Sequence, residues 1–185
     1  MSERIKSAVF LDRDGVLNVY MPGDYVKSLS DLQVLPGAAE AVRSFNHAQL
    51  MVFIISNQQG VAKGLMSEKD LHKIDDALRR NLAESAGGYV DQSYYCPHAA
   101  DAACECRKPQ AGMILQAARE HKIDLATSVF IGDTETDAQA ARAAGVGAFV
   151  LVLTGKHRDA AAFPEPVDHV APDLAEAAQW VLSRR

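Results

Sequence analysis

Four short apolar runs in the chain are typical of strands that are covered on both faces of a sheet. They are rich in β-branched and aromatic residues and lack strict alternation of apolar and polar positions. The sequence therefore predicts buried strands over residues 8–11, 51–56, 128–133 and 148–153, and a weaker strand over 89–96.

Between these runs, apolar residues recur every three or four positions, which is the period of an amphipathic helix. The longest such segment, 67–86, carries the apolar stripe Leu71, Ile74, Leu78 and Leu82. Ser67 and Asp70 at its start have the spacing of a capping box, with Asp in place of the usual Glu. The other predicted helices span 36–48, 110–122, 135–145 and the segment from Asp173 to near Arg185.

Alternating strands and helices predict an α/β fold with a doubly wound parallel sheet. The 185 residues contain no internal repeat or long linker, so we expect a single, monomeric domain over 1–185. The formal net charge of −5 argues against a nucleic-acid partner, which would favour a basic face. No apolar run is long enough for a membrane span or a signal peptide, which predicts a soluble cytoplasmic protein.

Polar side chains follow three of the predicted strands where each strand ends. Because ligands of open α/β sheets bind beyond the carboxyl ends of the strands, Asp12, Asn57 and Asp133 should meet at one edge. A Mg²⁺ ion would offset the repulsion between Asp12 and Asp14, with Asp133 as a third oxygen donor. Taken alone, "DRDG" could equally be an acidic turn. A calcium loop does not fit, because Gly15 stands fourth instead of sixth.

Two further segments carry groups that suit a bound anion. Ser56 and Asn57 precede a Gly-containing loop whose backbone N–H groups can cradle a phosphate. Arg107 and Lys108 lie just before a predicted helix start, where the helix dipole disfavours cations. A phosphate bound near these residues would account for both observations.

All three cysteines fall within one short segment that also contains a histidine. These residues are Cys96, His98, Cys104 and Cys106. Three thiolates and an imidazole suit a closed, tetrahedral structural zinc site, whereas a catalytic zinc would need an open position. The alternative is three reduced cysteines and a surface histidine. We expect zinc to brace this loop and so to hold Arg107 and Lys108 over the site.

Together, "DRDGVLN", "SNQ", the Lys of "CRKP" and "GDTETD" resemble the four motifs of the haloacid dehalogenase (HAD) superfamily of phosphohydrolases. The resemblance implies a Rossmann-like HAD fold, and the short connections leave room only for a minimal cap. Within the superfamily, the chain is similar to the zinc-containing branch of heptose bisphosphate phosphatases and histidinol-phosphate phosphatases.

The resemblance also implies a Mg²⁺-dependent phosphatase that works through an aspartyl-phosphate. Asp12 would be the nucleophile, and Asp14 would act first as general acid and then as general base. Mg²⁺ would be bound by Asp12, the backbone carbonyl of Asp14 and Asp133, with Asp137 in a supporting role. Charge on the phosphoryl group would be stabilised by Ser56, Asn57 and Lys108. The rest of the substrate would contact Tyr25, Gln58, Gln59 and Arg107.

The loop "NQQGVAKG" resembles that of the heptose enzymes, with Gln59 and Lys63 replacing Ser and Arg. This favours removal of the 7-phosphate of D-glycero-D-manno-heptose 1,7-bisphosphate, a step toward nucleotide-activated heptose for surface polysaccharide. Histidinol-phosphate phosphatase is an alternative, because the five-residue gap in the cysteine segment is also its spacing. Thr134 is a departure, since the heptose enzymes often have Lys there. A non-catalytic phosphosugar-binding module is the alternative of another class, and the Asp12/Asp14 pair argues against it.

Overall fold

The structure, a computed structural model, describes residues 6–184. Six strands are present: β1 (Ala8–Leu11), β2 (Met51–Asn57), β3 (Gln92–Cys96), β4 (Val129–Gly132), β5 (Ala148–Val152) and β6 (His169–Ala171). They form one sheet in the order β3-β2-β1-β4-β5-β6, and every pairing is parallel. The predicted doubly wound parallel sheet is therefore confirmed.

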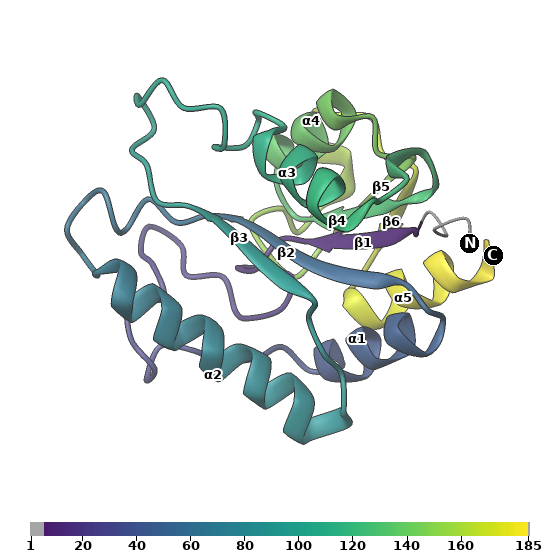
Figure 1. Cartoon of the computed structure of the whole chain (residues 1–185), viewed down its shortest axis with the longest axis horizontal. Helices are drawn as coiled ribbons and strands as arrows, with labels where there is room; N and C mark the ends of the chain where they lie inside the picture. Colours follow the sequence, from purple (N-terminus) through teal and green to yellow (C-terminus); the bar gives the residue numbers. More distant parts are fainter. Residues whose placement is uncertain (1–5, 185) are drawn as a thin grey trace.

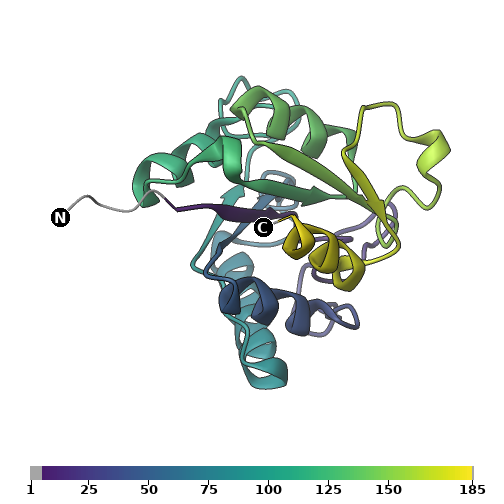
Figure 2. The ribbon, with the colours of Figure 1, turned by 90° about the vertical axis from the view of Figure 1, so that its right-hand side faces the viewer.

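Five α-helices cover the sheet: α1 (Ala38–His47), α2 (Glu68–Ala86), α3 (Gly112–His121), α4 (Glu135–Ala144) and α5 (Leu174–Ser183). Helices α1, α2 and α5 lie on one face, and α3 and α4 lie on the other (Figures 1 and 2). All five predicted helices are confirmed, although Arg185, the expected end of the last one, lies outside the described residues. Among residues 6–184, no helix has the length and hydrophobicity to cross a membrane. The single domain and the monomeric state stay predictions.

Strand β6 is an element that the sequence analysis missed. It contains only three residues, of which Ala171 alone is buried, so it carries no apolar run that a pattern search could detect. The strand exists because its backbone pairs with β5, from Val150–His169 to Val152–Ala171. Tertiary pairing, and not local preference, forms this edge.

The buried strands lack alternation because both faces of the sheet are covered by helices. In β1, Val9 and Leu11 join the core beneath α1, α2 and α5, whereas Ala8 and Phe10 join the core beneath α3 and α4. A row of four phenylalanines crosses this second face, from Phe53 through Phe10 and Phe130 to Phe149. Their ring centroids are 5.6, 6.4 and 6.2 Å apart in turn, and each pair is in register across neighbouring strands.

The strand order reverses direction between β1 and β4. Strands β2 and β3 extend the sheet on one side of β1, and β5 and β6 extend it beyond β4. The loops that leave β1 and β4 therefore part in opposite directions and open a crevice at the carboxyl edge, which is where ligands bind in such sheets. Asp12 directly follows β1 and Asp133 directly follows β4, so the topology brings both carboxylates to this crevice.

The start of α2 has the predicted capping box. The Asp70 backbone N–H donates to Ser67 Oγ at 3.1 Å, and the Ser67 backbone N–H donates to the Asp70 carboxylate at 3.3 Å. The Ser67 hydroxyl and Lys73 also donate to this carboxylate, and together these hydrogen bonds lower the pKa of Asp70 to about 2.

We expect the substitution Asp70→Asn to destabilise the protein in a pH-dependent way. The pKa of Asp70 is about 2 in the folded protein against an ordinary value of 3.8. The charged cap therefore stabilises the fold above about pH 4 and loses its effect as the pH falls through about 2. Melting curves followed by circular dichroism should show a lower Tm for the variant near neutral pH and a shrinking difference below about pH 4.

Asp76→Asn is the control, because Asp76 is an exposed carboxylate on the same helix. Its effect on the Tm should be small at every pH. A Tm difference for Asp70→Asn that does not change with pH would contradict the charge-based explanation.

Candidate active site

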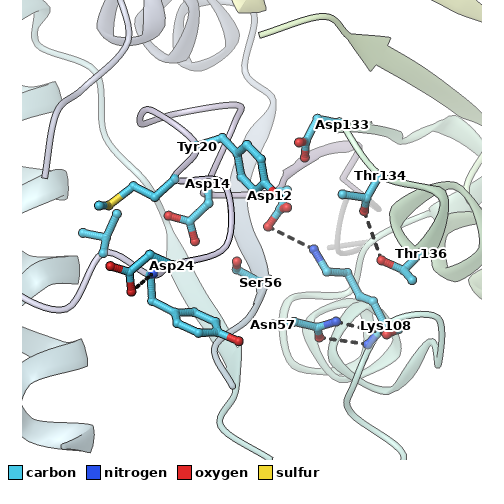
Figure 3. A pocket seen from close by; sticks show the side chains of 13 residues that line it. Asp12, Asp14, Tyr20, Asp24, Ser56, Asn57, Lys108, Asp133, Thr134 and Thr136 are labelled. Carbon is cyan, nitrogen blue, oxygen red and sulfur yellow. Dashed lines mark hydrogen bonds and ion pairs between the residues drawn. The ribbon is translucent and has the colours of Figure 1, made fainter. Parts of the chain in front are cut away.

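A cavity of about 210 Å³ lies at the carboxyl edge of the sheet, over the ends of β1, β2 and β4. Figure 3 shows Asp12, Asp14, Ser56 and Lys108 facing a common space. The complete lining is Asp12, Asp14, Tyr20, Met21, Asp24, Tyr25, Val26, Ser56, Asn57, Lys108, Asp133, Thr134 and Thr136. The structure thus brings together residues that the sequence placed on four separate segments.

Lys108 is a buried cation between two carboxylates. Its Nζ lies 3.0 Å from Asp12 Oδ1 and 2.6 Å from Asp137 Oδ1, and it donates to the backbone carbonyl of Ile55 at 2.7 Å. Burial alone would lower the pKa of Lys108, but the two carboxylates outweigh it and raise the pKa. The ammonium group is therefore charged, and it lies where it can stabilise a negative group in the cavity.

The side chain of Asn57 fixes the backbone of Lys108 from the end of β2. Its Nδ2 donates to the Lys108 carbonyl and its Oδ1 accepts from the Lys108 N–H, both at 3.0 Å (Figure 3). This two-point contact joins the loop that carries Lys108 to the central sheet. Asn57 also lines the cavity, where it could reach a bound phosphoryl group. That contact stays a prediction.

Asp12 and Asp133 form an acidic pair that suits a divalent cation. Burial, together with Asp137 and Asp14, raises the pKa of Asp12 to about 6, although Lys108 acts in the opposite direction. Burial, Asp12 and Asp137 raise the pKa of Asp133 well above its usual range. Asp133 Oδ1 is buried and has no hydrogen-bond partner among the described residues. A Mg²⁺ ion would supply both the missing positive charge and the missing partner.

Asp133 also packs against two glycines that leave no room for a side chain. A Cβ on Gly15 would lie 2.6 Å from Asp133 Oδ2, and Gly15 has a φ of +90° that favours glycine. A Cβ on Gly155 would lie even closer to the same oxygen, and the neighbouring Lys156 N–H donates to Asp133 Oδ2 at 2.6 Å. The backbone thus orients one oxygen of Asp133 and leaves the other for a ligand.

Asp137 occupies the N-terminal turn of α4 and connects that helix to the site. Its Oδ2 accepts from the backbone N–H groups of Asp133 and Thr134 and from the Thr134 hydroxyl, at 3.2, 3.0 and 2.7 Å. Its other oxygen pairs with Lys108. Asp137 lies within 4.8 Å of the ligating oxygens of Asp12 and Asp133, but its existing contacts fit a supporting role.

Both carboxylate oxygens of Asp14 are held by three side chains. Asn18 donates to Oδ1 at 2.9 Å, Gln58 donates to Oδ2 at 2.8 Å, and Arg13 Nη2 contacts both oxygens at 3.1 and 3.0 Å. Burial alone would raise the pKa of Asp14, but these contacts lower it, chiefly through the charge of Arg13. Asp14 therefore points into the cavity as a fixed carboxylate (Figure 3).

Arg13 and Asn18 are site residues that the sequence analysis missed. Both are fully buried, and both contact Asp14 from behind the cavity. The available signal was the position of Arg13, a cation between Asp12 and Asp14 directly after the first predicted strand. Gln58 was expected to contact the substrate, but it is only 1% exposed and is not part of the cavity lining. It is buried because its amide joins Asp14, Ser56 and Arg13.

Of the other residues expected to contact substrate, Tyr25 lines the cavity. Its hydroxyl donates to Gln59 Oε1 at 3.3 Å and accepts from Lys63 Nζ at 3.0 Å, so Gln59 lies behind it. Arg107 is not part of the lining and donates to the His98 carbonyl at 3.3 Å. The loop 19–26 supplies lining residues that the sequence did not suggest, among them Tyr20, Met21 and Asp24.

The cysteine segment forms a compact group that can hold a metal ion. The Sγ atom of Cys96 lies 3.8 Å from that of Cys104 and 3.3 Å from that of Cys106. His98 Nδ1 lies 3.5 and 3.2 Å from the Sγ atoms of Cys96 and Cys106. A tetrahedron with metal–sulfur bonds of about 2.3 Å has sulfur atoms about 3.8 Å apart. The three thiols are free of disulfides.

Comparisons with known proteins agree with this geometry. The HAD-hydrolase-like family profile matches residues 105–177. D-glycero-D-manno-heptose-1,7-bisphosphate 7-phosphatase of Thermosynechococcus vestitus is 39% identical over 96% of this chain and 96% of its own length. D-glycero-beta-D-manno-heptose-1,7-bisphosphate 7-phosphatase of Haemophilus ducreyi is 39% identical over 82% of this chain and 85% of its own length.

One solved structure also matches over almost its whole length. It is D,D-heptose 1,7-bisphosphate phosphatase from B. bronchiseptica, complexed with magnesium and phosphate. The TM-score is 0.89 and the identity 38%, with 97% of this chain and 99% of that chain covered.

We expect Asp133→Asn to weaken the binding of Mg²⁺ measured by isothermal titration calorimetry. The amide keeps the shape but loses the charge that draws the cation. Changes around metal ligands cost roughly 10–100-fold in affinity, so the loss here should be at least about tenfold. Asp24→Asn is the matched control, because Asp24 lines the same cavity without joining the acidic cluster. Equal Mg²⁺ affinities for the two variants would place the ion elsewhere.

Proposed function

Because this chain belongs to the HAD-like hydrolases, in the branch of the heptose bisphosphate phosphatases, we propose that it removes the 7-phosphate of D-glycero-D-manno-heptose 1,7-bisphosphate. The observation that carries this proposal is the cavity in which Asp12, Asp14, Lys108 and Asp133 converge. A relative of that name matches 96% of the chain. The product would enter the synthesis of nucleotide-activated heptose for surface polysaccharide.

The first half of the reaction transfers the phosphoryl group to the protein. A carboxylate oxygen of Asp12 attacks phosphorus and forms an aspartyl-phosphate, while the bond from phosphorus to the sugar oxygen breaks. Asp14 gives its proton to the departing sugar oxygen. Lys108 and the Ser56 hydroxyl face the transferring oxygens and stabilise their charge.

The second half returns Asp12 to its starting state. Asp14, now a carboxylate, takes a proton from a water molecule as that water attacks the aspartyl-phosphate, and inorganic phosphate leaves. Arg13, Asn18 and Gln58 favour the ionised form of Asp14, which is the form that acts as the base. A phosphate dianion beside Asp14 raises its pKa again, which favours the protonated form while substrate is bound.

Mg²⁺ is the proposed cofactor, bound by Asp12, Asp133 and the backbone carbonyl of Asp14. The donor set fits, because it offers carboxylate oxygens and includes the buried, unpartnered Asp133 Oδ1. When bound, Mg²⁺ would offset the negative charge of the phosphoryl oxygens and of the acidic cluster.

Zinc is the proposed ion of the group formed by Cys96, His98, Cys104 and Cys106, because soft thiolates with one imidazole select it. The site would be structural, since four protein ligands leave no position for substrate. It would brace the segment that ends two residues before Lys108.

A cluster of free thiols is also usual for cytoplasmic proteins, which is the location we propose.

The substrate assignment predicts a preference of at least about tenfold in kcat/KM for the heptose bisphosphate over histidinol phosphate, equivalent to about 1.4 kcal/mol. Both anomers of the bisphosphate should be assayed by phosphate release, because the Haemophilus ducreyi relative is named for the beta anomer and the Thermosynechococcus vestitus relative for neither. Asp12→Asn is the matched background control: it keeps the side-chain shape but cannot form the aspartyl-phosphate. A preference for histidinol phosphate would identify the protein as a histidinol-phosphate phosphatase and leave the proposed phosphatase mechanism unchanged.

The metal assignment predicts about one tightly bound zinc per chain in protein purified without added metal. Cys106→Ser should lose this zinc and lower the Tm, because metal binding and loop folding are coupled. The control is Asp101→Ala, an exposed change in the same loop. Elemental analysis gives the zinc content and calorimetry gives the Tm. Wild-type protein that contains no zinc would contradict the assignment. An unchanged Tm after the zinc is removed with a chelator would contradict its structural role.

A further inference from the structure

Arg13 is a fully buried arginine directly behind the cavity, with 0% of its surface exposed. Its Nη2 contacts both carboxylate oxygens of Asp14 and donates to Gln58 Oε1 at 3.1 Å. Its Nε and Nη1 atoms have no hydrogen-bond partner among the described residues. Burying a charged group with unpaired N–H donors is costly, so folding alone does not favour arginine at this position.

The guanidinium of Arg13 also lies over an aromatic ring. The Cζ atom of Arg13 lies 5.8 Å from the centroid of Tyr95, a residue of β3. A cation over an aromatic face is stabilised by the ring quadrupole, and the stabilisation grows when both groups are removed from water. Tyr95 therefore stabilises the buried cation of Arg13 in addition to its hydrogen bonds.

Tyr95 is in turn anchored to helix α2. Its hydroxyl donates to Asp75 Oδ1 at 2.7 Å, and the Ser93 hydroxyl donates to the same oxygen at 2.8 Å. Asp75 is itself buried, and its hydrogen bond to the Tyr95 hydroxyl fixes the orientation of the ring. A continuous set of contacts thus runs from Asp75 through Tyr95 and Arg13 to Asp14.

We propose that Arg13 is a positioning residue for Asp14, and that Tyr95, anchored by Asp75, positions Arg13. Neither Arg13 nor Tyr95 lines the cavity, so they act on the reaction through Asp14. Their effect is to aim the Asp14 carboxyl at the oxygen that leaves the substrate. The inference rests on the proposed function, because it assigns support to the general acid of that reaction.

The leaving group provides a test that a merely structural role would not pass. A sugar alkoxide must receive a proton as it departs, whereas p-nitrophenolate departs without one. We expect Arg13→Met to lower kcat for the heptose bisphosphate at least about tenfold more than kcat for p-nitrophenyl phosphate, since general acid catalysis contributes about 10²–10⁴-fold. Arg13→Lys, which keeps the charge, should recover part of the difference.

Tyr95→Leu is the second variant, and Tyr94→Leu is its matched control. The two tyrosines are neighbours in β3, but Tyr94 packs into the core beneath α3 and α4 and donates to Glu120. We expect Tyr95→Leu to reduce turnover of the alkyl ester selectively. Tyr94→Leu should change turnover of both esters by the same factor, as a general loss of stability would.

Equal losses on both esters in folded Arg13→Met and Tyr95→Leu proteins would overturn the positioning role, and so would full activity on the sugar phosphate. In either case, Asp12-dependent hydrolysis of p-nitrophenyl phosphate by the wild-type protein would leave the phosphatase assignment intact. A wild-type protein that hydrolyses neither ester would overturn the proposed function, and the positioning role with it.

Discussion

The mutual repulsion of carboxylates at one edge of the sheet is the constraint on which the rest of the site depends. Asp12, Asp14, Asp133 and Asp137 are all mostly or fully buried there. Two buried cations offset the charge of three of them, since Lys108 lies between Asp12 and Asp137 and Arg13 contacts Asp14. Among residues 6–184, no cationic side chain is in direct contact with Asp133, which is why the geometry favours a metal ion at that position.

The two cations, Lys108 and Arg13, are held in place by different contacts. Lys108 lies in the loop between β3 and α3, and Asn57 fixes its backbone through two hydrogen bonds. Arg13 is the second residue after β1 and is fixed by the side chains around its guanidinium. The charge balance of the site therefore depends on contacts from β2, β3 and α2, far from the acids in sequence.

The sequence was informative where a residue's role follows from its place at a strand end. Asp12 and Asp133 could be placed together because parallel strands deliver their carboxyl ends to one edge. Side-chain direction in loops has no such rule. Gln58 is buried outside the cavity lining and Arg107 faces the cysteine segment, although both flank residues that line the cavity. Strand β6 exists only through pairing with β5, and the role of Arg13 requires the ring of Tyr95, which no local pattern links to it.

The row of phenylalanines across the sheet has a consequence for how this chain can evolve. Phe10 stands two residues before Asp12, Phe53 three before Ser56, and Phe130 three before Asp133. Because a one-residue slip in register inverts every side chain of a strand, the stacked rings also set the alignment of the catalytic edge. A substitution at one of these phenylalanines is expected to persist only together with a compensating change at a neighbouring one. Covariation within the row would then mark these core positions as determinants of the site.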